Sequence, residues 1–130
     1  MAETVATEGS GAAHILVVED DAAYREALGH ILQREGYSAS LTADFRGALE
    51  ILESERPVDL MLVDIVMPDR VNGIALARMA RLRRRDIKII YITGYNIPGI
   101  DREALGPILR KPIDDTALLQ EIDKVLSSQS

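Results

Sequence analysis

The strongest constraint on the fold is a repeated alternation between short apolar runs and segments with helical spacing. The clearest runs, at residues 14–18, 60–63 and 88–93, are nearly continuous in apolar residues and rich in β-branched ones. Runs of this kind are typical of parallel strands that are buried on both faces. Weaker strand signals lie at residues 38–42 and 108–110.

Apolar residues spaced three and four apart predict helices between these strands. Asp21 is a candidate N-cap of the first helix, and Gly36 marks its expected end. A second helix starts near Phe45 and is expected to end at Pro57, and a third carries apolar residues from Ile74 onward.

The last helix is expected to begin at Asp114 or Asp115, whereas the stretch between Thr93 and Ile108 holds only a short helical pattern at residues 101–105. Strand and helix therefore alternate about five times, which predicts an α/β fold with a doubly wound parallel sheet.

Polar residues gather where the predicted strands end. Glu19 and Asp20 follow the first strand, Asp64 the third, Thr93 the fourth and Lys111 the fifth. Any one of them alone is more often a turn former or a solvated charge. In doubly wound sheets, however, function lies in the crevice beyond the carboxyl ends of the strands. We therefore expect these five side chains to form one site.

This set of groups fits phosphoryl chemistry. Clustered carboxylates repel one another unless a cation lies among them, and oxygen ligands suit Mg²⁺. A carboxylate can take up a phosphoryl group as an acyl phosphate, whose oxygens a lysine and a hydroxyl can neutralise and orient.

Four motifs together give a specific resemblance: ILVVEDD, LMLVDIVMP, IIYITGY and LRKP. In this order, and over the span from Ile15 to Leu126, the sequence resembles the receiver domain of bacterial two-component response regulators. The resemblance implies a flavodoxin-like five-stranded sheet of order 2-1-3-4-5. It also implies a phosphoacceptor module that receives its phosphoryl group from a sensor histidine kinase or a histidine phosphotransfer protein.

The resemblance also assigns a role to each site residue. Asp64 matches the phosphorylated aspartate and a metal ligand. Asp20 matches a direct Mg²⁺ ligand, Glu19 a ligand acting through water, and Val66 a ligand through its backbone carbonyl.

Thr93 matches the hydroxyl that binds a phosphoryl oxygen, and Lys111 the lysine that pairs with the phosphoryl group. The Lys111–Pro112 bond is a candidate cis peptide.

The sequence departs from the family pattern near the last strand. Ile108 stands where family members usually have an aromatic residue, so the usual threonine-then-aromatic switch is in doubt. Tyr91 or Tyr95 could substitute, although core packing explains Tyr91 and a loop contact Tyr95. The short, glycine- and proline-rich span before Ile108 predicts a short or irregular fourth helix.

Composition argues against several kinds of protein and binding site. The formal net charge of −6 argues against direct nucleic-acid binding, and the lack of cysteine excludes disulfides and thiolate metal sites. No apolar run is long enough for a membrane span and no signal peptide is visible, so a cytoplasmic protein is expected.

We divide the chain into a flexible segment at residues 1–13, a receiver domain at 14–127 and a tail at 128–130.

Three other classes of protein compete with a phosphoacceptor. An aspartyl-phosphate phosphatase needs a general acid two residues after the nucleophile, where this chain has Val66. A nucleotide-binding domain lacks its glycine-rich motif. A pseudo-receiver, acting only as an interaction domain, stays open, as do the downstream protein partner and a homodimer.

Overall fold

The computed structural model describes residues 13–66, 73–94 and 102–127. Its five strands form one parallel sheet in the order β2-β1-β3-β4-β5, which confirms the predicted topology. The strands are β1 (His14–Val18), β2 (Ser38–Thr42), β3 (Leu60–Asp64), β4 (Lys88–Thr93) and β5 (Ile108–Arg110). Residues 1–12 of the expected leading segment and the tail at 128–130 lie outside the described residues.

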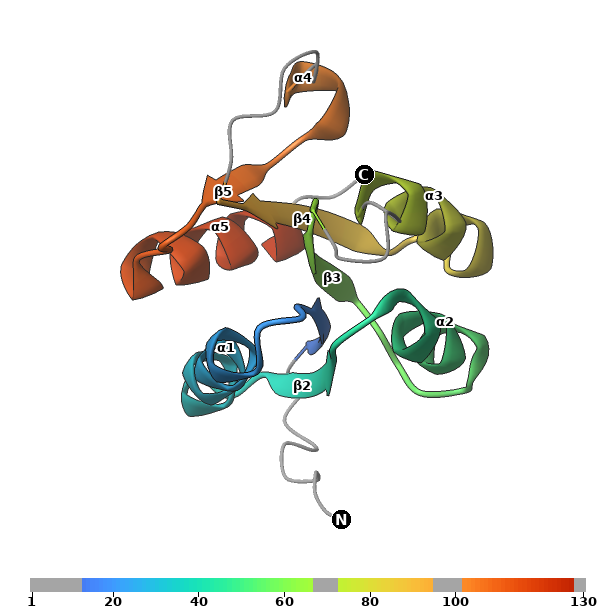
Figure 1. Cartoon of the computed structure of the whole chain (residues 1–130), viewed down its shortest axis with the longest axis horizontal. Helices are drawn as coiled ribbons and strands as arrows, with labels where there is room; N and C mark the ends of the chain where they lie inside the picture. The colour runs from blue at the N-terminus through green and yellow to red at the C-terminus, as the bar shows by residue number, and fades with distance from the viewer. Residues whose placement is uncertain (1–12, 67–72, 95–101, 128–130) are drawn as a thin grey trace.

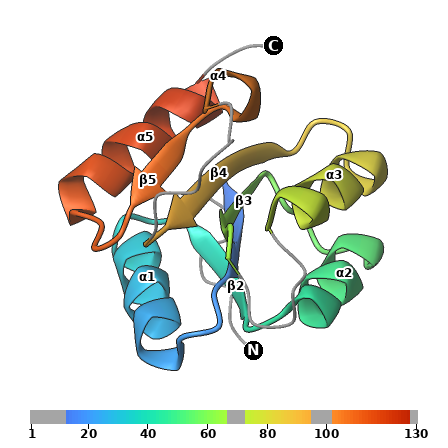
Figure 2. The ribbon, with the colours of Figure 1, turned by 45° about the horizontal axis from the view of Figure 1, so that its top comes forward.

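In the described part of the chain there are five helices, four that connect successive strands and one that follows the last strand. Figures 1 and 2 show one pair, α1 and α5, on one face of the sheet and a second pair, α2 and α3, on the other. The helices are α1 (Ala22–Arg34), α2 (Phe45–Glu53), α3 (Gly73–Arg83), α4 (Arg102–Leu105) and α5 (Asp115–Ser127). No helix of the described residues has both the length and the apolar character needed to cross a membrane.

The core consists of two apolar layers, one on each face of the sheet. Along β1, Leu16 and Val18 belong to the layer beneath α2 and α3, whereas Ile15 and Val17 belong to the layer beneath α1 and α5. Because successive residues of a strand point to opposite faces, a strand buried on both sides must be apolar throughout. This explains the continuous apolar runs.

Local capping explains where α1 begins and ends. The Asp21 carboxylate accepts a hydrogen bond from the Tyr24 amide at 3.0 Å, as expected of an N-cap. Gly36 follows the C-cap with φ of +93°, a conformation that favours glycine.

The predicted end of α2 at Pro57 is wrong, because the helix stops at Glu53. The guanidinium of Arg84, the residue after α3, donates to the carbonyls of Leu52 at 3.0 Å and Ser54 at 2.9 Å. These bonds satisfy carbonyl groups that the ended helix leaves unpaired.

The fourth helix is short, as predicted, with only four residues. Leu105 and Ile108 pack against the layer beneath α2 and α3, and Tyr91 is part of that layer. Tyr91 is 1% exposed, so core packing, the simpler interpretation, is confirmed. Tyr95 lies outside the described residues.

Candidate functional site

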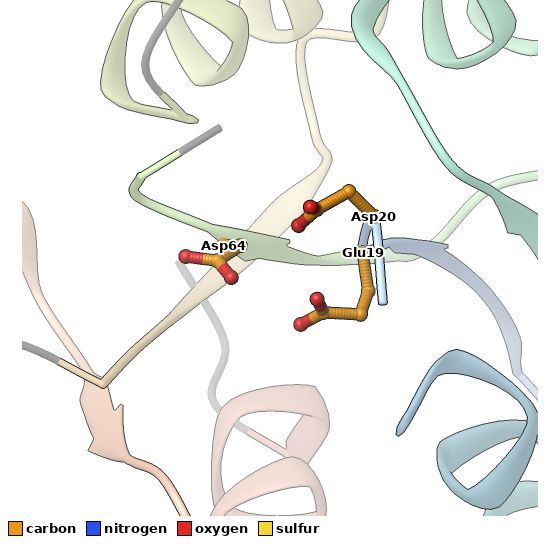
Figure 3. A group of neighbouring side chains, drawn as sticks. All are labelled: Glu19, Asp20 and Asp64. Carbon is orange, nitrogen blue, oxygen red and sulfur yellow. The ribbon is translucent and has the colours of Figure 1, made fainter. Parts of the chain in front are cut away.

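Three carboxylates meet at the carboxyl ends of β1 and β3. The pairing of Val18 with Val63 sets the residues after β1 beside the last residue of β3. Figure 3 shows the side chains of Glu19 and Asp20 extending toward Asp64, and an oxygen from each of the three lies within 4.8 Å of the others. Glu19 is fully buried and Asp64 nearly so, whereas Asp20 is exposed.

Lys111 reaches the same cluster from the end of β5. Its Nζ lies 2.7 Å from Glu19 Oε1 and 2.7 Å from Asp64 Oδ2. Its backbone N–H donates to the Thr93 carbonyl at 2.9 Å, which extends the β4–β5 pairing to the site. The Lys111–Pro112 peptide bond is cis, as predicted.

The ionisation of the cluster follows from its burial. Desolvation raises the pKa of Glu19 above its ordinary value, although the Lys111 ammonium acts in the opposite direction. Burial alone would lower the pKa of Lys111, but hydrogen bonds and charges from Asp64 and Glu19 raise it instead. The lysine is therefore a permanent cation at physiological pH.

Asp64 is held from two sides. Its Oδ1 accepts a hydrogen bond from the Val66 amide at 2.9 Å, and its Oδ2 accepts one from Lys111 at 2.7 Å. Ile92 on β4 pairs with Asp64, so Thr93 lies one residue further along the neighbouring strand and is 2% exposed. All the residues predicted from the strand ends thus lie at one edge of the sheet.

The donor set suits a hard divalent cation. With all three carboxylates ionised, one ammonium leaves two negative charges uncompensated at the site. Glu19 Oε1 is buried, and it forms an ion pair with Lys111 Nζ at 2.7 Å. Carboxylate oxygens and open positions for water are what Mg²⁺ prefers. The residues present therefore fit this ion.

Gly73 supports the site from behind. Its backbone N–H donates to the Ile65 carbonyl at 2.8 Å, joining the start of α3 to the end of β3. A Cβ atom on Gly73 would lie 2.2 Å from the carbonyl oxygen of Asp64. Glycine is required here for close approach.

A protein-family model for the response regulator receiver domain matches residues 15–123. The chain belongs to this family. Among curated relatives, it is 37% identical over 116 residues to the response regulator receiver protein CpdR of Brucella abortus, covering 86% of this chain and 95% of that protein. Receiver domains of this family are signalling domains of two-component systems.

Other relatives are longer proteins. The chain is 35% identical to the sensor kinase CckA of Brucella abortus, covering 95% of this chain but 14% of that protein. It spans about half the length of the response regulator MprA of Mycolicibacterium vanbaalenii, at 36% identity over 86% of this chain. A solved receiver domain protein from Methanospirillum hungatei superimposes with a TM-score of 0.80 at 29% identity, over 90% of this chain and 95% of that one.

Two residues beside the site could not be identified from the sequence. Arg25 donates from its guanidinium to the Glu19 carbonyl at 2.9 Å and to the Asp20 carbonyl at 3.4 Å. The Tyr24 hydroxyl accepts a hydrogen bond from the Ile113 amide at 3.1 Å. Tyr24 shares the three-and-four spacing of the apolar residues of α1, which is typical of a core position, and no local signal indicates a partner as distant in sequence as Ile113.

Proposed function

We propose that the chain is a phosphoacceptor module of a two-component phosphorelay, with Asp64 as the residue phosphorylated. The observation that carries this proposal is the position of Asp64: a nearly buried carboxylate at a strand end, held by Lys111 and flanked by an acidic pair. A phosphohistidine of a sensor kinase or phosphotransfer protein is the proposed donor. An Asp64 oxygen attacks its phosphorus, and the imidazole nitrogen leaves with the electron pair of the broken bond.

Each neighbouring residue has a proposed part. Lys111 neutralises the charge of the transferred phosphoryl group, and the Thr93 hydroxyl binds one of its oxygens. Val66 N–H keeps the Asp64 carboxylate oriented.

Glu19, Asp20, Asp64 and the Val66 backbone carbonyl are the proposed holders of Mg²⁺. When bound, this ion would supply positive charge against the phosphoryl oxygens.

Output is proposed to pass through protein contacts, in the cytoplasm and without direct DNA binding. Phosphorylation would shift the balance between two conformations of the region around Thr93. Ile108 is half-buried against the core layer beneath α2 and α3. The conformational change therefore cannot proceed by inward rotation of an aromatic ring at position 108. Output through a homodimer is also proposed.

The test of this function is phosphorylation by a small acyl phosphate, followed by the mass of the intact protein. We expect one phosphoryl adduct in the presence of Mg²⁺ and none when the ion is chelated, because the uncompensated negative charge then repels the donor. No adduct from a folded protein with Mg²⁺ would instead favour the pseudo-receiver, in which the same surface serves only for interaction.

The adduct is expected to be long-lived. The Val66 side chain is apolar and 43% exposed beside the site, so it cannot orient a water molecule for attack on the phosphoryl group. We expect Val66→Asn to speed hydrolysis about tenfold by holding such a water, as measured by loss of the adduct after donor removal. Val66→Ala is the control, and equal lifetimes for the asparagine and alanine variants would contradict this role.

A further inference from the structure

Tyr24 connects α1 to the turn that carries Lys111. Its hydroxyl accepts the Ile113 amide hydrogen at 3.1 Å, across 89 positions of sequence. Its ring lies beneath the lysine, with Nζ 5.0 Å from the ring centroid. One side chain therefore contacts both the head group of Lys111 and the backbone two residues after it.

The ring face is suited to an ammonium in this setting. A cation over an aromatic face is attracted to it, and more strongly where water is partly excluded. The Lys111 side chain is 24% exposed, and Tyr24 is half-buried against the apolar layer beneath α1 and α5. Burial also raises the pKa of the Tyr24 phenol, so the ring stays neutral at physiological pH.

The hydroxyl acts on the backbone. Lysine has a long, flexible side chain, so the position of its ammonium depends on where the backbone enters the site and on what the chain rests against. The hydrogen bond to Ile113 fixes where the backbone enters the site, and the Tyr24 ring is the surface on which the lysine side chain rests. The main chain of Tyr24 is itself fixed, because its amide donates to the N-cap Asp21.

We propose that Tyr24 is a positioning residue for Lys111, holding the ammonium toward Asp64 through its ring and the following turn through its hydroxyl. The proposal rests on the proposed function, in which Lys111 neutralises a phosphoryl group on Asp64. Tyr24 is not a replacement for the aromatic residue expected at Ile108. It lies on the α1 side of the sheet, whereas Ile108 packs against the layer on the other side.

The contact itself is tested by NMR on the unphosphorylated protein with Tyr24→Phe and Tyr24→Leu. We expect the ε-methylene protons of Lys111 to show an upfield ring-current shift in the wild type and in Tyr24→Phe, and to lose it in Tyr24→Leu. The Ile113 amide proton should move upfield in both variants, because both lack the acceptor. An unchanged Lys111 signal in Tyr24→Leu would overturn the proposal.

The effect of Tyr24 on the phosphorylation of Asp64 is tested by the initial rate of adduct formation with a small acyl phosphate and Mg²⁺. Tyr24→Leu is expected to slow the reaction about three- to tenfold, and Tyr24→Phe less, because the cation–ring attraction is retained. Tyr37→Leu is the matched control, since Tyr37 packs on the same apolar layer, and its rate should stay near that of the wild type.

The outcomes separate this inference from the proposed function. A wild type that forms no adduct refutes the phosphoacceptor function, and the Lys111 signal then still decides whether Tyr24 holds the lysine. A wild type that reacts normally while Tyr24→Leu and Tyr37→Leu behave alike refutes the inference alone. An equal decrease in the rate of adduct formation in Tyr24→Phe and Tyr24→Leu would overturn the role assigned to the ring.

Discussion

Asp64→Asn is expected to lose the phosphoryl adduct completely while keeping its fold. Asparagine has nearly the same shape as aspartate. Its side-chain carbonyl can still accept the hydrogen bond that the Val66 amide donates to Asp64 at 2.9 Å in the wild type. The amide, however, is neutral and a poor nucleophile, so it cannot form the acyl phosphate. Intact mass after treatment with an acyl phosphate and Mg²⁺ measures the loss, and circular dichroism checks the fold.

The matched control is Asp86→Asn, which makes the same chemical change in an exposed turn between α3 and β4. It should give the wild-type adduct. An adduct of equal yield in Asp64→Asn would show that another residue accepts the phosphoryl group, and the proposed role of Asp64 would be wrong.

Gly73→Ala is expected to destabilise the protein by about 3 kcal/mol. The added Cβ would lie 2.2 Å from the Asp64 carbonyl oxygen, and backbone atoms of β3 cannot move aside without disturbing the sheet. Alanine favours a helix by about 1 kcal/mol over glycine, less than the cost of the clash. Urea unfolding measures the free-energy change, and the shifted strand end should also slow phosphorylation of Asp64.

Gly94→Ala provides the control for this change. Among the described residues, a Cβ on Gly94 would first meet the Lys111 side chain, at 3.9 Å, an ordinary contact distance. Its free energy of unfolding should stay within about 0.5 kcal/mol of the wild type. If Gly73→Ala were as stable as Gly94→Ala, the start of α3 would be free to move away from β3.

The strands could be predicted closely because burial on both faces leaves a local mark. In β3, every residue is buried, and the sequence shows this directly as a run of apolar residues ending at Asp64. The N-cap Asp21 and the positive φ of Gly36 are equally local signals, since each depends on the few residues beside it. The convergence of the strand-end residues followed from parallel strands lying side by side, in the order that the family resemblance implied.

Features that depend on distant partners could not be predicted in this way. The end of α2 at Glu53 is capped by Arg84, about thirty positions further along the chain, and lies before Pro57. Tyr24 looked like an ordinary core residue of a helix, because its contact with Ile113 requires the whole sheet to be assembled first. The close approach of Gly73 to Asp64 likewise exists only once α3 packs against β3.

The central claim, that Asp64 forms an acyl phosphate, is tested most directly by chemical reduction of the phosphorylated protein. Borohydride reduces an acyl phosphate to an alcohol and releases phosphate, so a phosphorylated aspartate becomes homoserine. Peptide mass spectrometry should then find homoserine at position 64 and nowhere else. Homoserine at another position, or an adduct that survives reduction while Asp64 is unchanged, would contradict the account.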